Sequence, residues 1–107
     1  MNLEINSEQD SWLENSLKYL NFGRIAKQEK LRIESSQRSF FRITSKDYNS
    51  IILMVVPHGI DESVRSFVEK AEIFKKYSVN VPNVYSYDLK LGLILVEDFG
   101  DNIYQYN

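Results

Sequence analysis

Cysteine is absent from this sequence of 107 residues, and histidine occurs once, as His58. The absence of cysteine excludes disulfide bonds, thiolate catalysis and cysteine-ligated zinc or iron–sulfur sites. A single histidine leaves little for a histidine-based metal site. The sequence therefore favours no metal centre within the chain.

An excess of basic residues and a long apolar run are also missing. Thirteen lysines and arginines face fifteen acidic residues, for a net charge of -2, whereas a protein that neutralises many phosphates normally needs a basic excess. The longest apolar run, residues 51–56, is far too short to cross a bilayer, and the polar N-terminus does not resemble a signal peptide. We therefore expect a cytoplasmic protein with no nucleic-acid partner and no membrane partner.

Apolar residues make up 43% of the chain, enough for the core of one soluble domain or of part of one. The charged residues 24–30 indicate a connector after the first helix. Helical spacing of four apolar residues predicts that first helix over residues 7–20, with Ser7 as its cap; the four are Trp12, Leu13, Leu17 and Leu20.

Alternating and continuous apolar patterns then predict a sheet. Three strands separated by polar turns are expected at residues 31–34, 40–44 and 51–56. The third strand is apolar throughout, which is typical of a strand covered on both faces. Asp61 is expected to cap a second helix over residues 62–77, and a hairpin of residues 84–87 and 93–96 follows. This order predicts an α+β fold with a five-stranded antiparallel sheet and the helices on one side.

Three short motifs sharpen the fold class. They are Ser-Ser-Gln-Arg-Ser-Phe-Phe-Arg-Ile at residues 35–43, Val-Asn-Val-Pro-Asn-Val at 79–84 and Leu-Ile-Leu-Val-Glu-Asp-Phe-Gly-Asp at 93–101. Their order and separation resemble the N-terminal lobe of the aminoglycoside phosphotransferase family, which is protein-kinase-like. The nearest branch is the bacterial kinases that phosphorylate N-acetylmuramate and N-acetylglucosamine at the anomeric position. The resemblance covers about residues 10–107.

The resemblance implies a division of the chain and a reaction. Residues 1–23 would form an N-terminal helix, residues 24–96 the small lobe, and residues 97–107 a hinge leading to a C-terminal lobe that this sequence lacks. Members of the family transfer the γ-phosphoryl group of ATP to a hydroxyl of a sugar or amino sugar, with Mg²⁺ bridging the phosphates. Their catalytic loop, His-Gly-Asp-x-x-x-x-Asn, and their metal-binding aspartate lie in the C-terminal lobe.

Neither of those two elements occurs here, because His58 is followed by Gly-Ile. We therefore expect no catalytic residue and no Mg²⁺ ligand in this chain, which would be inactive by itself. Its expected partner is a nucleotide, and a sugar or amino sugar would bind only together with a C-terminal lobe.

The resemblance also assigns nucleotide contacts to the first turn and to the third strand. Backbone N–H groups of Ser35, Ser36 and Gln37, with the side chain of Arg38, would lie over the ATP phosphates; the alternative is an exposed hairpin turn. Met54 stands where kinase-like proteins carry a phosphate-binding lysine, and methionine supplies no charge. It is therefore an adenine-side contact or a core contact. Whether Arg38 or Arg42 replaces the missing charge is left open.

Further contacts fall on the second helix and on the hinge. Glu69 matches the helix glutamate that normally orients the strand lysine, or it is a solvated residue near Arg65. The backbone at Glu97 and Phe99 would recognise adenine, and Asp101 would approach the ribose; the alternative is a polar loop.

A different class of function is also compatible with the sequence. The chain would then be an inert, stand-alone interaction module, or a decayed gene product, with a kinase-lobe fold and no nucleotide site. Met54 and the absence of glycine from residues 35–39 favour this alternative.

Overall fold

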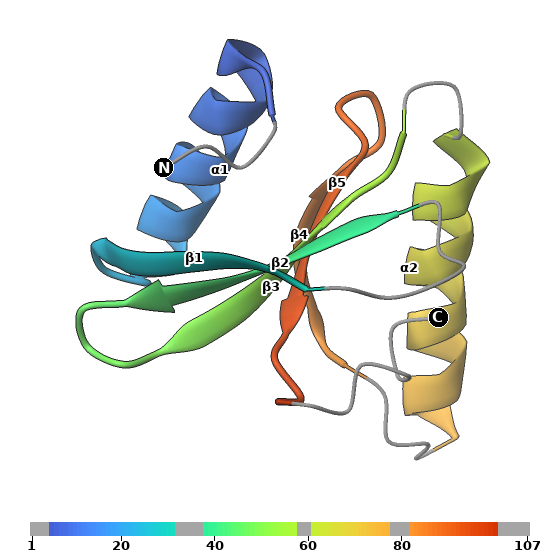
Figure 1. Cartoon of the computed structure of the whole chain (residues 1–107). Coiled ribbons are helices and arrows are strands. Elements are labelled where there is room, and N and C mark those ends of the chain that lie inside the picture. The colour runs from blue at the N-terminus through green and yellow to red at the C-terminus, as the bar shows by residue number, and fades with distance from the viewer. Residues whose placement is uncertain (1–4, 32–37, 58–60, 78–81, 101–107) are drawn as a thin grey trace.

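The computed structural model describes residues 5–31, 38–57, 61–77 and 82–100. Strands of one antiparallel sheet follow each other in the order β1-β2-β3-β5-β4, with a helix before the first strand and another between β3 and β4 (Figure 1). The elements are α1 (Ser7–Tyr19), β1 (Ile25–Leu31), β2 (Ser39–Ser45), β3 (Ser50–Val55), α2 (Asp61–Lys76), β4 (Val84–Asp88) and β5 (Leu93–Glu97). The α+β class and the five-stranded antiparallel sheet are confirmed.

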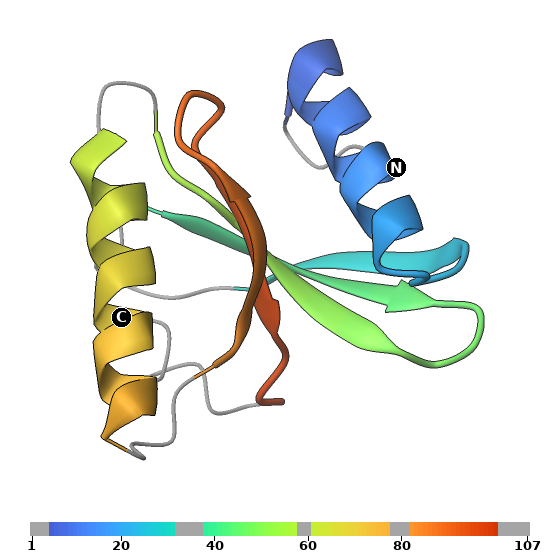
Figure 2. The same cartoon turned by 180° about the vertical axis from the view of Figure 1, so that it is seen from behind.

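The two helices cover opposite faces of this sheet (Figures 1 and 2). We call the two buried groups the α1-side core and the α2-side core. The α1-side core joins Leu13 and Leu17 of α1 to Phe41, Ile43, Ile51, Leu53, Leu93 and Leu95 of the strands, together with Phe22. The α2-side core joins Val64 of α2 to Phe40, Ile52, Met54, Val56, Ile94 and Val96.

The expectation that both helices lie on one side is therefore wrong. Successive side chains of a strand point to opposite faces, and the central strands are apolar at successive positions. Ile52 and Leu53 are neighbours in β3, and neither has any exposed surface. A sheet that is apolar on both faces needs a cover on each.

Strand β1 begins earlier than the sequence pattern indicated. Residues 24–30 were expected to be a connector, but Ile25–Leu31 pairs with β2 from Ile25 opposite Ser45 to Leu31 opposite Phe40. Most of β1 is exposed or half-buried because it is an edge strand. It therefore lacks the apolar alternation that identifies a strand, and backbone pairing with β2 defines it. Of the predicted strand 31–34, residues 32–34 lie outside the described residues.

Asn6, and not Ser7, caps α1. The Asn6 side chain accepts a hydrogen bond from the Gln9 N–H at 2.8 Å, and the Gln9 side chain accepts one from the Asn6 N–H at 2.9 Å. This reciprocal pair is a capping box. The Gln9 amide also donates to the Leu91 carbonyl at 2.8 Å, which ties the start of α1 to the turn between β4 and β5.

The remaining elements agree with the sequence pattern to within a residue or two. The strands expected at 40–44 and 51–56, the hairpin and the second helix are all present. On α2, Val64 and Val68 are buried, whereas Phe74 is 44% exposed. None of the described helices combines the length and apolar character needed to span a bilayer.

Replacing Asn6 by alanine is expected to destabilise the protein by about 1 kcal/mol, because a helix N-terminus loses a side-chain acceptor. The matched control is Ser7→Ala, next to it on the exposed start of the helix, with an expected effect below about 0.5 kcal/mol. Urea unfolding followed by circular dichroism measures both. A larger loss for Ser7→Ala than for Asn6→Ala would contradict the assignment of the cap.

Candidate functional site

The chain leaves the sheet after β5, and one arginine of β2 holds it there. We call residues 97–100 the exit segment. The Arg42 guanidinium donates from Nε to Asp98 Oδ2 at 2.8 Å and from Nη2 to Asp98 Oδ1 at 3.3 Å. Nη2 also donates to the Gly100 carbonyl at 2.6 Å, and Nη1 lies 3.6 Å from Glu29 Oε1. A single side chain thus links β1, β2 and the exit segment.

Strand register explains why these residues meet. Glu29 is opposite Arg42 on β1 and β2. Arg42 is opposite Ile52 on β3, and Ile52 is opposite Val96 on β5. These four side chains therefore lie in one row on the α2 side of the sheet. Asp98 is two residues beyond Val96, so the alternation of a strand returns its side chain to the same face.

The carboxylate of Asp98 is largely enclosed, with 7% of its side chain exposed. Burial by itself raises the pKa of this group. Hydrogen bonds from Arg42, Ser50 and the Gly100 N–H, together with the positive charge of Arg42, outweigh the burial and lower the pKa of Asp98 below its ordinary value. Asp98 is therefore a stable anion at neutral pH, bound to the arginine.

Glu97 is held by the other edge of the sheet. Its Oε1 accepts hydrogen bonds from the Asn83 backbone N–H at 3.1 Å and from the Asn83 amide at 3.0 Å. Lys75, near the end of α2, donates to Asn83 Oδ1 at 2.7 Å. Burial, together with the negative charge of Glu97, raises the pKa of Tyr85. The Glu97 side chain thus ties β5 to β4 and, through Asn83, to α2.

The α2 side of the sheet brings together three of the predicted nucleotide contacts. Met54 has no exposed surface and belongs to the α2-side core, against which Phe99 packs while partly buried. The Arg38 guanidinium carbon lies 5.8 Å from the ring centre of Phe67, which borders the same core. Of the two alternatives for Met54, the structure shows the core contact.

Of the other predicted residues, Glu97 lies at the end of β5 and contacts Asn83. Glu69 is exposed on α2, and Ser35, Ser36, Gln37 and Asp101 lie outside the described residues. Sequence reasoning missed Asp98 and Asn83 as contacts of Arg42 and Glu97. Because side chains alternate along a strand, Asp98 lies on the same face as Val96. With the strand register known, this alternation would have indicated the pair of Arg42 and Asp98.

Grooves lie beside both edge strands in the described part of the chain. One of about 690 Å³ separates α1 from β1, and one of about 430 Å³ separates α2 from β4. Asn83, the partner of Glu97, lines the smaller groove. Neither groove is lined by Arg38, Met54 or Phe99.

Within the described ranges, no three histidine or acidic side chains are grouped in a way that could hold a metal ion. No protein-family model, no curated protein and no solved structure matches the chain. The case for a function therefore rests on the residues and on the fold.

Asp98→Asn is expected to lower the free energy of unfolding at pH 7 by about 1–3 kcal/mol, because Arg42 loses the nearer of its two carboxylate partners. The pKa of Asp98 is lower in the folded protein than the unfolded value of about 3.9. The ionised group therefore stabilises the fold above about pH 4, and this contribution is lost as the pH falls through the folded pKa.

Urea unfolding of wild type and Asp98→Asn between pH 3 and pH 7 checks this dependence. The difference between them is expected to shrink as the pH falls below about 4. Asp47→Asn, in the exposed turn between β2 and β3, is the control, with an expected effect below about 0.5 kcal/mol. A difference that stays constant over the whole range would show that the Asp98 charge is not what stabilises the fold.

Met54→Lys tests whether this position can hold the lysine of kinase-like proteins. Because Met54 is fully buried among apolar side chains, we expect an unpaired buried charge to cost about 3 kcal/mol or more. Met54→Leu, which nearly conserves volume, should cost less than about 1.5 kcal/mol. Thermal unfolding compares the two, and a Met54→Lys protein as stable as Met54→Leu would mean that the site opens readily to solvent.

Proposed function

We propose that this chain is the ATP-binding N-terminal lobe of a phosphotransferase that moves the γ-phosphoryl group of ATP to a hydroxyl of a sugar or amino sugar. The observation that carries the proposal is the order in which the chain forms its strands and helix. Three antiparallel strands are followed by a helix and a returning hairpin, and the chain then leaves from β5 in the interior of the sheet. A kinase-like small lobe has the same order of strands and helix, which supports the proposal together with the three sequence motifs.

In this proposal the nucleotide lies on the α2 side of the sheet, next to the exit segment. Backbone groups near Glu97 and Phe99 contact the adenine edge, and the apolar side chain of Phe99 borders the base. Arg38, immediately before β2, is the cation nearest the phosphates and, with the backbone of Ser35 and Ser36, offsets their charge. Met54 supports this surface from the core.

The proposal assigns no Mg²⁺ ligand to this chain. The described part of the chain has no group of three or more acidic or histidine side chains that could hold a metal ion. Phosphoryl transfer depends on positioning and on charge stabilisation from both lobes. The lobe therefore contributes nucleotide binding, and the acceptor and the metal depend on a C-terminal lobe.

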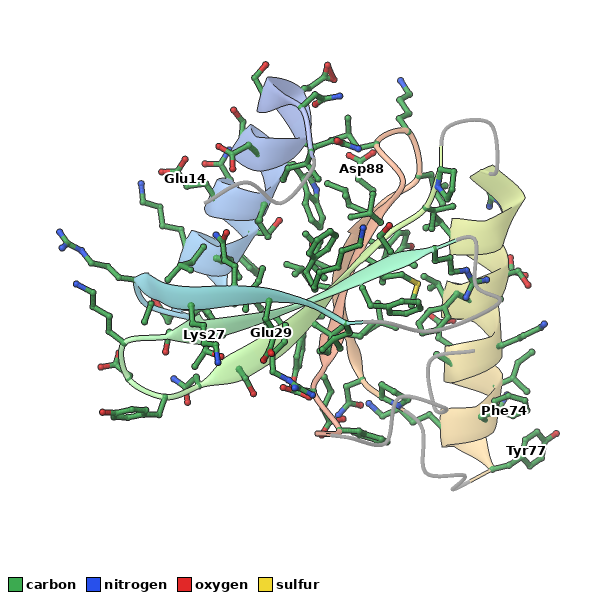
Figure 3. The ribbon with its side chains drawn as sticks, in the orientation of Figure 1. Glu14, Lys27, Glu29, Phe74, Tyr77 and Asp88 are labelled. Atoms are coloured by element: carbon green, nitrogen blue, oxygen red, sulfur yellow. The ribbon has the colours of Figure 1, made fainter. Side chains whose placement is uncertain are left out.

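A second candidate is the inert interaction module. Met54 and Phe40 are sealed in the α2-side core, with 0% and 1% of their surfaces exposed, so the sheet presents no charged group at the lysine position. Large apolar side chains are also exposed at the end of α2, where Phe74 and Tyr77 point away from the sheet (Figure 3). Such side chains are typical of a surface that contacts another protein.

Titration of the 107-residue chain with Mg-ATP, followed by nuclear magnetic resonance, separates the two candidates. We expect saturable binding, with the largest shifts at residues 97–100 and at Arg38, and no phosphoryl transfer to N-acetylmuramate or N-acetylglucosamine. Arg38→Gln should weaken ATP binding, because a charge near the phosphates is lost. Arg65→Gln, which removes an exposed arginine of α2, is the matched control and should leave binding unchanged.

Absence of binding at millimolar nucleotide would favour the interaction module. A measurable kinase rate from the purified chain would instead contradict the expectation that it is inactive alone.

A further inference from the structure

We propose that Arg42 is a positioning residue, which fixes the exit segment for adenine recognition and does not contact the phosphates. This inference rests on the proposed function, since it concerns the same nucleotide site. It also assigns to Arg38, and not to Arg42, the positive charge that would replace a phosphate-binding lysine at Met54.

All three nitrogens of the Arg42 guanidinium face partners within the protein. Nε and Nη2 donate to Asp98, Nη2 donates also to the Gly100 carbonyl, and Nη1 faces Glu29. Figure 3 shows Glu29 on β1, on the side of the sheet toward the end of β5. Only 18% of the Arg42 side chain is exposed. A guanidinium with these partners has few N–H donors available for a ligand.

The local charge leads to the same conclusion. Arg42 lies between two carboxylates, those of Glu29 and Asp98. Because the lowered pKa of Asp98 keeps it ionised at neutral pH, the three groups together are not cationic. A phosphate would gain little attraction from this cluster. The Arg38 guanidinium lies over the ring of Phe67, with 5.8 Å from its carbon to the ring centre.

The contacts hold the backbone of the exit segment in one conformation. Asp98 Oδ1 accepts a hydrogen bond from the Gly100 N–H at 2.8 Å, while Arg42 binds the Gly100 carbonyl. Gly100 has a φ of 67°, in the left-handed region that favours glycine. Backbone recognition of a base needs N–H and C=O groups held in place before the ligand arrives. Arg42 and Asp98 together provide that order.

A comparison of adenosine with ATP separates positioning from phosphate contact. If Arg42 positions the adenine-reading backbone, Arg42→Gln should weaken adenosine and ATP binding by the same factor, about tenfold or more. A phosphate contact would weaken ATP and leave adenosine unchanged. Isothermal titration of the 107-residue chain with each ligand gives both affinities, and Arg65→Gln serves as the control that should change neither.

Further variants and hydrogen exchange show whether the effect passes through Asp98. Arg42→Lys keeps the charge but loses the planar fork, so it should resemble Arg42→Gln. Asp98→Asn should weaken the binding of adenosine and of ATP by a similar factor. The double variant that carries Arg42→Gln and Asp98→Asn should bind both ligands no more weakly than either single variant. Hydrogen exchange should accelerate at the Gly100 amide in Arg42→Gln and stay unchanged at the β3 amides, which also shows that the variant is folded.

The outcomes are distinguishable. Loss of ATP affinity alone in Arg42→Gln, or unchanged affinity for both ligands, overturns the inference and leaves the proposed function standing. Failure of the wild-type chain to bind either ligand overturns the proposed function, and the inference with it. If Arg42→Gln does not fold, Arg42→Lys is compared in its place, with the same two results deciding.

Discussion

Burial of the central strands on both faces is the constraint on which the rest of this structure depends. Ile52, Leu53, Ile94 and Leu95 have no exposed surface although neighbours in each strand point to opposite sides. Burying apolar surface is the main favourable term in folding. Each face therefore recruits a helix, α1 on one side and α2 on the other (Figure 2). Because both faces of the sheet are covered, the polar contacts described above lie at its edges and at the ends of its strands.

Polar contacts then fix the pieces that the core does not order by itself. Gln9 joins the start of α1 to the turn before β5, and Lys75 joins the end of α2 to Asn83 beside β4. Arg42 joins β1, β2 and the exit segment. The Arg42–Asp98 contact has a charged group on both sides, and hydrogen bonds of this kind are stronger than neutral ones.

The separation between the apolar core and the polar contacts at the strand ends bears on the proposed function. Met54 is fully buried in the α2-side core, whereas the exit segment is held by a partly buried ion pair between Arg42 and Asp98. If the chain binds a nucleotide, adenine recognition through backbone groups is the better-prepared half of the site. In the proposal above, Arg38 is the cation assigned to the phosphates. An interaction module would have the same contacts between Arg42 and the exit segment, but its Arg38 would bind no phosphate.

The sequence by itself determined the α+β class, the β2 and β3 strands, the second helix and the final hairpin, because apolar periodicity records which faces are buried. It did not determine β1, whose edge position leaves no apolar pattern, or the cap at Asn6, because serine and asparagine are both good caps. Only the tertiary structure decided that the helices lie on opposite faces and that Arg42 pairs with Asp98. Those two results depend on strand order and register, which bring together residues 56 positions apart in the chain.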